Sequence, residues 1–322
     1  MRSRFSTLDA LRGIAAIGVM LTHSHDYNSR FPSGYLAVDL FFGLSGFVMA
    51  LSYQERLRAG MGIGQFLTRR AARLWPMLLV GAALGVLLLN GSLGMVMLIP
   101  DWSSSGQLFP ANGPLWSLLM EACAYVAFAL VIARLGTGGL VALVVASGIT
   151  LIAFAARQDA NLVSFGNEWH AVPPGLARTA YAFSLGVLMF RLRAVQGMPK
   201  VTSARSWLLP VGLVYIMLLL PQVDRSASLC AMMLGVPLIV WWSTKWEVPN
   251  LRLASGLSDL SYPMYCIHLP ILAVAGTHGV YAGVLWLPLI GLSLLLDRIW
   301  DRPMRHALRV LAESGRARPK AA

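Results

Sequence analysis

Charged side chains are scarce in this sequence. Asp, Glu, Lys and Arg together make up 12% of the 322 residues, whereas a soluble globular domain carries roughly 25%. Half that share of charged residues cannot cover a water-facing surface. Hydrophobic residues, in contrast, make up 57% of the chain. The composition therefore argues against a soluble domain and favours a protein that is embedded in the lipid bilayer.

Cysteine is scarce as well. The three cysteines, Cys123, Cys230 and Cys266, lie in apolar segments and show no C-x-x-C spacing. This pattern excludes a disulfide framework and a zinc site, and we expect the cysteines to be small packing residues. The G-x-S-x-G pattern of a serine nucleophile is also absent. We expect no permanently bound metal or cofactor.

Long apolar runs, by contrast, are abundant. A membrane-spanning helix needs about 20 mainly apolar residues, and ten runs approach that length. We predict an all-α polytopic membrane domain over residues 1–300, followed by a basic cytoplasmic tail over 301–322. The expected spans, with soft boundaries, are 8–24, 34–53, 74–90, 114–134, 139–156, 175–192, 206–220, 227–243, 257–276 and 279–299. No cleavage site follows the first run, so we expect it to be retained.

Basic residues are distributed unevenly between the two sides of this arrangement. Of the 26 Lys and Arg residues, 22 fall on the side that holds both termini and 4 on the other. Because cytoplasmic loops are enriched in Lys and Arg, this bias predicts that both termini are cytoplasmic. It also explains the net charge of +12 as topology and argues against nucleic-acid binding. We expect a multi-pass protein of the cell membrane, such as a bacterial inner membrane.

Ionisable side chains inside spans are candidates for function, because burying them in lipid is unfavourable unless they are paired or hydrated. Arg12 and His23 are eleven residues apart in the first span. In a helix this spacing puts both on one face, about 16 Å apart along the axis. Asp9, one turn before Arg12, can pair with it. The alternative is that both side chains reach separately to the membrane surfaces.

The second span carries one carboxylate among small residues. Asp39 lies within Gly34–Phe47, with Gly43, Ser45 and Gly46 close by. Glycines allow two helices to approach closely, and a serine can form a hydrogen bond across their interface. Asp39 is then either a site residue or the partner of a His or Arg on a neighbouring helix.

The fourth span contains Trp116, Ser117, Glu121 and Tyr125. Glu121 falls about two turns inside the apolar run, and Tyr125 follows one turn later. A membrane-embedded carboxylate without a role is uncommon, although a hydrogen-bonded structural carboxylate is the alternative.

A basic stretch precedes the third span. Arg69, Arg70 and Arg73 lie just before Pro76, and guanidinium groups can bind phosphate with two parallel hydrogen bonds. Taken alone, these residues favour a simpler reading, namely cytoplasmic topology and contact with lipid headgroups.

The ninth span places Tyr265 and His268 one turn apart between Pro263 and Pro270. Each proline leaves a backbone carbonyl without its helical partner, and groups other than lipid must satisfy it. A kinked helix with a hydrogen-bonded histidine is the structural alternative to a site.

Taken together, these stretches resemble the acyltransferase-3 family of membrane O-acyltransferases. The family's Leu-Asp-x-Leu-Arg-Gly and Arg-x10-His patterns match Leu8 to Gly13 and Arg12 to His23. Further matches, in the family's order, are Ala37–Phe47 (with Ala37 in place of glycine), Arg70–Arg73 before Pro76, Trp116–Glu121 and Ser261–Pro270. The resemblance extends along nearly the whole chain.

The resemblance implies an enzyme that takes an acyl group, expected to be acetyl, from cytoplasmic acyl-CoA. The implied acceptor is a hydroxyl of a cell-surface glycan or of its lipid-linked precursor. It also implies that Arg12 and His23 are required. Some relatives carry a fused extracytoplasmic hydrolase-like domain, and we expect none here, because the chain stops soon after the tenth span.

A neutral histidine is the usual general base near pH 7, and we assign this role to His23 in a direct transfer without an acyl-enzyme. Asp39, Glu121 and His268 remain open as groups that orient it, and Tyr265, Trp116 and Ser117 as donors to the thioester oxyanion. The expected catalytic residues are His23, Arg12, Glu121 and Asp39, and the expected substrate-binding residues are Asp9, Arg69, Arg70, Arg73, Ser45, Trp116, Ser117, Tyr125, Tyr265 and His268.

The rival interpretation is a proton-coupled transporter or flippase, since buried His, Asp and Glu residues are what a proton relay needs. Transporters often show repeated halves with matching broken helices, and this sequence has no such repeat. Consumption of acyl-CoA by the purified protein separates the two interpretations.

Overall fold

The structure is a computed structural model that describes residues 5–25, 31, 33–103, 106–157, 166–195, 201–205, 207–219 and 225–314. Within these ranges the chain is mainly helical, because a helix satisfies its own backbone N–H and C=O groups where no water is present. The main helices of the first half are α1 (Ser6–Thr22), α2 (Ala37–Met49), α3 (Glu55–Arg58), α4 (Ile63–Leu89), α5 (Leu115–Ala127), α6 (Thr137–Ala156) and α7 (Val172–Val195).

The second half continues in the same way. Its main helices are α8 (Leu208–Leu219), α9 (Arg225–Cys230), α10 (Val236–Lys245), α11 (Leu251–Thr277), α12 (Trp286–Leu296) and α13 (Arg302–Ser314). Two short parallel strands, β1 (Val201–Thr202) and β2 (Trp246–Glu247), pair where the chain leaves α7 and α10.

Short 3-10 and π-helical segments precede, join or extend these helices. The 3-10 segments are η2 (Gly34–Leu36), η4 (Leu93–Met97), η6 (Trp169–Ala171) and η8 (Ala282–Leu285), and the π-helical segments are η3 (Ala50–Gln54), η5 (Phe128–Ile132), η7 (Ala231–Gly235) and η9 (Asp297–Asp301).

Seven of the helical segments in the described residues are long and apolar enough to cross a membrane. This finding supports an all-α, multi-pass membrane bundle. Helices α1, α7 and α8 lie where we expected the spans 8–24, 175–192 and 206–220, but they are not among these seven. The number of ten spans and the cytoplasmic termini therefore stay predictions. Residues 206, 220 and 315–322, part of the expected seventh span and tail, lie outside the described residues.

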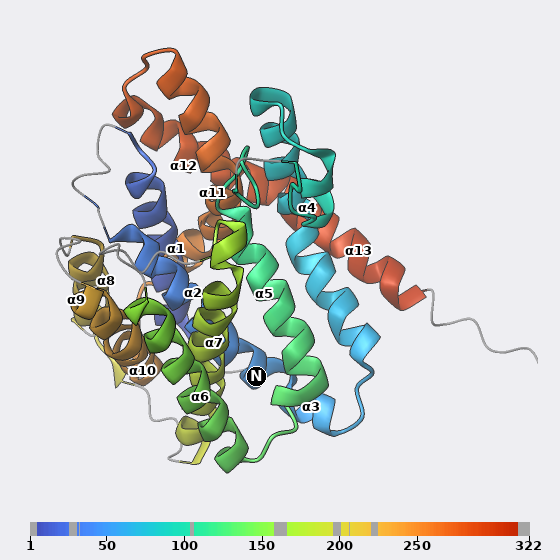
Figure 1. Cartoon of the computed structure of the whole chain (residues 1–322), viewed down its shortest axis with the longest axis vertical. Coiled ribbons are helices and arrows are strands. Elements are labelled where there is room, and N and C mark those ends of the chain that lie inside the picture. Colours follow the sequence, from blue (N-terminus) through green and yellow to red (C-terminus); the bar gives the residue numbers. More distant parts are fainter. Residues whose placement is uncertain are drawn as a thin grey trace, which may run out of the picture.

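Two helix pairs form the centre of the bundle. Helix α1 packs along α11 and α2 packs along α7, with α4 and α13 on one flank and α8–α10 on the other (Figure 1). A Cβ atom added to Gly13 would lie 2.3 Å from the Leu257 carbonyl oxygen, and one on Gly46 would lie 2.0 Å from that of Phe183. The expected close approach at Gly46 is thus confirmed, since a side chain there would push α2 away from α7.

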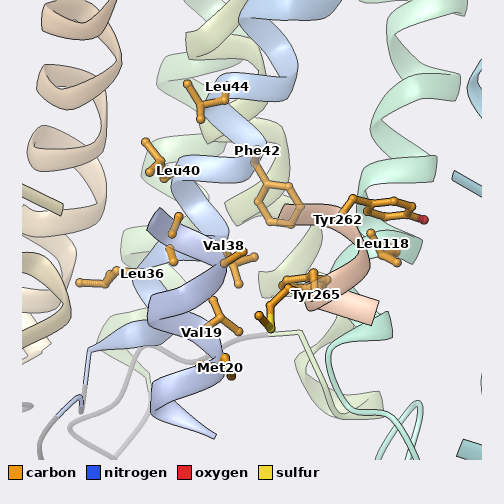
Figure 2. Packing of buried hydrophobic residues seen from close by; sticks show 14 of the residues in the cluster. Val19, Met20, Leu36, Val38, Leu40, Phe42, Leu44, Leu118, Tyr262 and Tyr265 are labelled. Carbon is orange, nitrogen blue, oxygen red and sulfur yellow. The ribbon is translucent and has the colours of Figure 1, made fainter. Parts of the chain in front are cut away.

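The largest apolar core connects these helices. Figure 2 shows side chains from α1, α2, α5 and α11 meeting in one cluster. Phe42 and Tyr265, for example, are 2% and 6% exposed. The aromatic residues of the candidate site are therefore part of the packed interior, and the site is held by the same contacts that hold the bundle.

Helix α4 begins earlier than the apolar run that predicted it. It starts at Ile63, so that Arg69, Arg70 and Arg73 form part of the helix and Pro76 lies in its interior. The helix ends at Leu89, and Asn90, which follows it, adopts a left-handed conformation with φ of 54°, as Asn often does at a helix C-terminus. The expected span 74–90 describes the part of α4 that lies in lipid, and that boundary stays a prediction.

The stretch expected as a basic tail begins with α13, which is tied to the bundle by ion pairs. Arg302 contacts Asp297 and Asp259, and Arg305 lies 3.0 Å from Asp301 and 3.2 Å from Asp297. At least the first part of the tail is therefore attached to the membrane domain.

Candidate active site

A pair of histidines connects the end of α1 to the middle of α11. His23 directly follows α1 and is exposed, whereas His268 of α11 is fully buried. Nδ1 of His23 lies 2.9 Å from the carbonyl oxygen of Val19 and 3.3 Å from Nε2 of His268. Of the three residues left open as partners of His23, His268 is thus in contact with it.

The hydrogen-bond partners assign the tautomers of both rings. Nδ1 of His268 lies 3.0 Å from the carbonyl oxygens of Met264 and Tyr265, so it must carry a proton, and Nε2 is the acceptor in the neutral ring. Nδ1 of His23 faces the Val19 carbonyl and that acceptor, so it also carries a proton. Nε2 of His23 is then left with its lone pair free to accept a proton.

Tyr265 and Ser117 continue the row of polar groups inward. Their hydroxyls are 2.6 Å apart, and both lie within hydrogen-bond distance of the Pro114 carbonyl oxygen. The Tyr265 ring centre is 6.0 Å from that of His268. Residues from α5 and α11 that the sequence placed in different motifs therefore meet at one point.

Arg12 lies beside a small cavity at the inner end of this row. The cavity has a volume of about 40 Å³, which holds one or two water molecules. Its polar lining residues are Arg12, Ser117, Glu121, Ser261, Tyr262 and Tyr265. Arg12 lines this cavity together with residues of α2, α5 and α11, and His23 contacts His268 of α11.

Glu121 belongs to a partly buried polar network. It accepts a hydrogen bond from Ser45 at 2.6 Å and another from the hydroxyl of Tyr125. The Tyr125 hydroxyl also accepts a bond from Arg70 at 3.0 Å, and the Arg70 guanidinium lies over the Tyr125 ring. The network joins α2, α4 and α5, and it brings together residues that we predicted separately as parts of the site.

Arg70 also lines a larger groove between α4 and α5. This groove, of about 270 Å³, has walls that are mostly apolar, and Tyr125 lies beside Arg70 along it. Nε of Arg70 is buried and has no hydrogen-bond partner. The side chain therefore retains a donor for a ligand.

Arg73 follows Arg70 by three residues, about one turn, on α4. Its guanidinium lies over the ring of Tyr262, 5.2 Å from the ring centre, and 3.9 Å from a carboxylate oxygen of Asp301. Nη1 of Arg73 is likewise buried without a hydrogen-bond partner. Arg69 is half-buried on the same helix, and Asp9 accepts a weak bond from Ser258 at 3.5 Å.

Asp39 pairs with an arginine that sequence reasoning missed. Arg178 of α7 donates to both carboxylate oxygens of Asp39, at 2.7 and 2.6 Å, and to the Tyr35 carbonyl oxygen. Asp39 and Arg178 are completely buried, and the Arg178 guanidinium also lies over Trp116. This geometry matches the structural alternative for Asp39, a partner for a neighbour's arginine. The sequence signal for Arg178 was a lone basic residue within an apolar run.

Comparisons with known proteins identify the family of this chain. Residues 5–296 match the family model described as "Acyltransferase domain". The chain belongs to the acyltransferase-3 family. A curated relative, "Protein 2 in picA locus" of Rhizobium radiobacter, is 47% identical over 83 residues, which is 25% of this chain and 44% of the relative. The aligned part thus spans less than half of that relative, and no solved structure matches.

The structure of this acyltransferase-3 family member also shows how one proline in α11 is tolerated. Pro270 leaves the Cys266 carbonyl without a helical partner, and the buried Asn112 donates to that oxygen at 3.0 Å and to the Gly81 carbonyl at 3.1 Å. The expectation of a partner other than lipid is confirmed here. Asn112 itself was missed, because nothing in the sequence near it points to α11.

Proposed function

We propose that this protein is a membrane O-acyltransferase that moves an acetyl group from acetyl-CoA to a hydroxyl of a glycan or glycolipid. One observation carries the proposal: a row of polar groups runs from the Arg12 and Glu121 cavity through Tyr265 to the His23–His268 pair. A cationic inner end and a basic outer end are what a transfer between an anionic donor and a neutral alcohol requires.

His23 is the general base in this proposal. Its Nε2 takes the proton from the acceptor hydroxyl as the oxygen attacks the thioester carbonyl. The new C–O ester bond forms, the C–S bond breaks, and the proton passes from His23 to the departing CoA thiolate. His268 accepts from Nδ1–H of His23 and so stabilises the imidazolium that forms.

Direct transfer fits the surroundings of the serines at this site. Ser45 donates to Glu121, and Ser117 is bonded to Tyr265 and to the Pro114 carbonyl. A serine nucleophile would need a hydrogen bond to a base such as histidine. Tyr265 and Ser117 have hydroxyls that can instead donate to the developing oxyanion, and Trp116 remains a further candidate donor.

We infer that the phosphates of CoA bind to Arg70 and Arg73, with Arg69 nearby. The unpartnered, buried N–H groups of Arg70 and Arg73 support this inference, because such groups are unfavourable unless a ligand or water bonds to them. Guanidinium groups suit phosphate oxygens in particular.

The charged nucleotide would stay at the cytoplasmic surface while the pantetheine arm enters the bundle, because phosphate is expensive to desolvate. The roughly 16 Å along α1 between Arg12 and His23 is of the order of that arm's reach. Since the cavity beside Arg12 has a volume of only about 40 Å³, its side chains must move when the donor binds. A structure with bound acyl-CoA tests this route, and a thioester at the cytoplasmic surface would rule it out.

The test of the proposed function is acyl-CoA consumption by the purified protein in detergent with candidate glycans. We expect the wild-type protein to release free CoA only when an acceptor is present, and His23→Gln to release none above background. A transporter or flippase would leave acyl-CoA intact under all of these conditions.

A further inference from the structure

Arg193 is a buried cation near the end of α7, and no ion pair among the described residues involves it. Its side chain is 2% exposed, and its Nε and Nη2 atoms are buried with no hydrogen-bond partner. The other described arginines of this helix are satisfied. Arg178 pairs with Asp39, and Arg191 donates to Gln54 and to the carbonyl oxygens of Leu135 and Ile132.

A second cation lies next to Arg193. The guanidinium of Arg193 is 5.4 Å from the ring centre of Trp241, and the ammonium of Lys245 is 5.3 Å from the same ring. Lys245 also lies 5.5 Å from the ring centre of Trp242. The ion pairs found among the described residues include neither Arg193 nor Lys245, so two positive charges share one indole without a carboxylate between them.

An uncompensated buried guanidinium is unfavourable, and it becomes favourable when an anion pairs with it and accepts its hydrogen bonds. Phosphate suits this task, because its oxygens accept the parallel N–H groups of arginine. The β1–β2 pair joins the chain just after α7 and α10, so both cations lie at the same end of the bundle. Our charge count predicts that this end is cytoplasmic, where anionic headgroups are abundant.

We propose that Arg193, Lys245 and Trp241 form a binding site for a phosphate-bearing anion, separate from the acyl-transfer site. A phospholipid headgroup of the inner leaflet and a soluble phosphate compound share this chemistry. The aromatic rings belong to the site as well, since Trp is enriched at the membrane surface, where lipid phosphates lie.

The experiment measures thermal unfolding of the full-length protein as wild type, Arg193→Gln and Arg205→Gln. Arg205 is an exposed arginine close to the same strands and serves as the matched control. Each protein is studied in neutral detergent alone, in nanodiscs of phosphatidylcholine, and in nanodiscs that also contain phosphatidylglycerol. A fourth arm adds inorganic phosphate to the detergent sample.

We expect a reversal between conditions. Without an anion, Arg193→Gln should unfold at the same temperature as wild type or higher, because an unpaired buried charge has been removed. With phosphatidylglycerol, wild type and Arg205→Gln should gain several degrees and Arg193→Gln should not. If inorganic phosphate in detergent stabilises wild type and Arg205→Gln but not Arg193→Gln, the ligand is a soluble anion.

Equal shifts for wild type and Arg193→Gln in every arm would overturn the proposal. If Arg193→Gln does not accumulate, Lys245→Gln replaces it, since Lys245 is only partly buried. If the anion raises the unfolding temperature of Lys245→Gln as much as that of wild type, the proposal is also overturned.

Discussion

The contact between His23 and His268 gives the most specific prediction at the scale of single residues. His268→Phe keeps an aromatic ring but removes the acceptor for Nδ1–H of His23. We expect kcat to fall about 10- to 100-fold, less than the roughly 10²- to 10⁴-fold that a general base itself contributes, because His23 is still present. His268→Gln offers an amide oxygen in a similar place and should recover part of the loss, while KM for acyl-CoA should stay the same in both variants.

Steady-state kinetics with purified variants check this prediction. Equal losses in His268→Phe and His268→Gln would point to a packing role for the ring. A change confined to KM would mean that His268 binds substrate and does not position the base.

The donor-binding role of Arg70 and Arg73 is a second prediction at this scale. Replacing either residue by Ala should weaken binding of acyl-CoA about 10- to 100-fold, because a hydrogen bond to a charged group contributes about 1.5–3 kcal/mol. Arg252→Ala, which removes an exposed arginine from the side that we expect to be cytoplasmic, is the control. Isothermal titration with a non-hydrolysable acyl-CoA analogue gives the affinities, and unchanged values for both variants would leave the arginines with a role in topology only.

Helical periodicity predicts which residues of one helix lie on the same face, and this is why Arg12 and His23 could be placed together from the sequence. Contacts between helices were harder to foresee. Arg178 meets Asp39 from 139 residues away, and Asn112 reaches Cys266 across 154 residues. Single-helix patterns carry no information about such distances along the chain, so these partners emerged only from the folded bundle.

At the scale of helices, the Asp39–Arg178 pair fixes α2 against α7. Asp39→Ala leaves the guanidinium buried and unpaired, and we expect it to lower the free energy of unfolding by about 3–5 kcal/mol. The double variant Asp39→Leu, Arg178→Met should recover much of this loss, because two apolar side chains replace two charges. Thermal unfolding in detergent measures both effects.

The same variants separate a structural role from a catalytic one. If the double variant regains stability and also regains acyl transfer, Asp39 acts only through the packing of α2 and α7. Restored stability without activity would support the catalytic role that the sequence suggested for Asp39.

Helix positions followed closely from the apolar runs, but helix ends did not. The run beginning at residue 74 belongs to a helix that starts at Ile63. Hydropathy detects the part of a helix that faces lipid or the core, whereas a helix continues for as long as its backbone hydrogen bonds are satisfied. The basic first turns of α4, which the family resemblance singled out, are therefore helical although they are polar.

For the whole molecule, the number of spans is the main question of topology: seven helical segments among the described residues qualify by length and composition, and we expect ten. The bias of 22 basic residues against 4 predicts that both termini are cytoplasmic. A fluorescent reporter that matures only in the cytoplasm should therefore be active at either terminus, and a phosphatase that needs the opposite side should be inactive at both. Activity of the phosphatase at one terminus would mean an odd number of spans.

The central claim is that this protein acylates a surface glycan with His23 as the base. Mass spectrometry of surface glycans tests it most directly, in cells that lack the gene and in cells that express wild type or His23→Ala at equal membrane abundance. We predict an added acyl mass with wild type only, since removal of a general base lowers the rate about 10²- to 10⁴-fold. The same acyl mass in the His23→Ala cells would contradict the assignment of the base, and glycans of identical mass in all three would contradict the function.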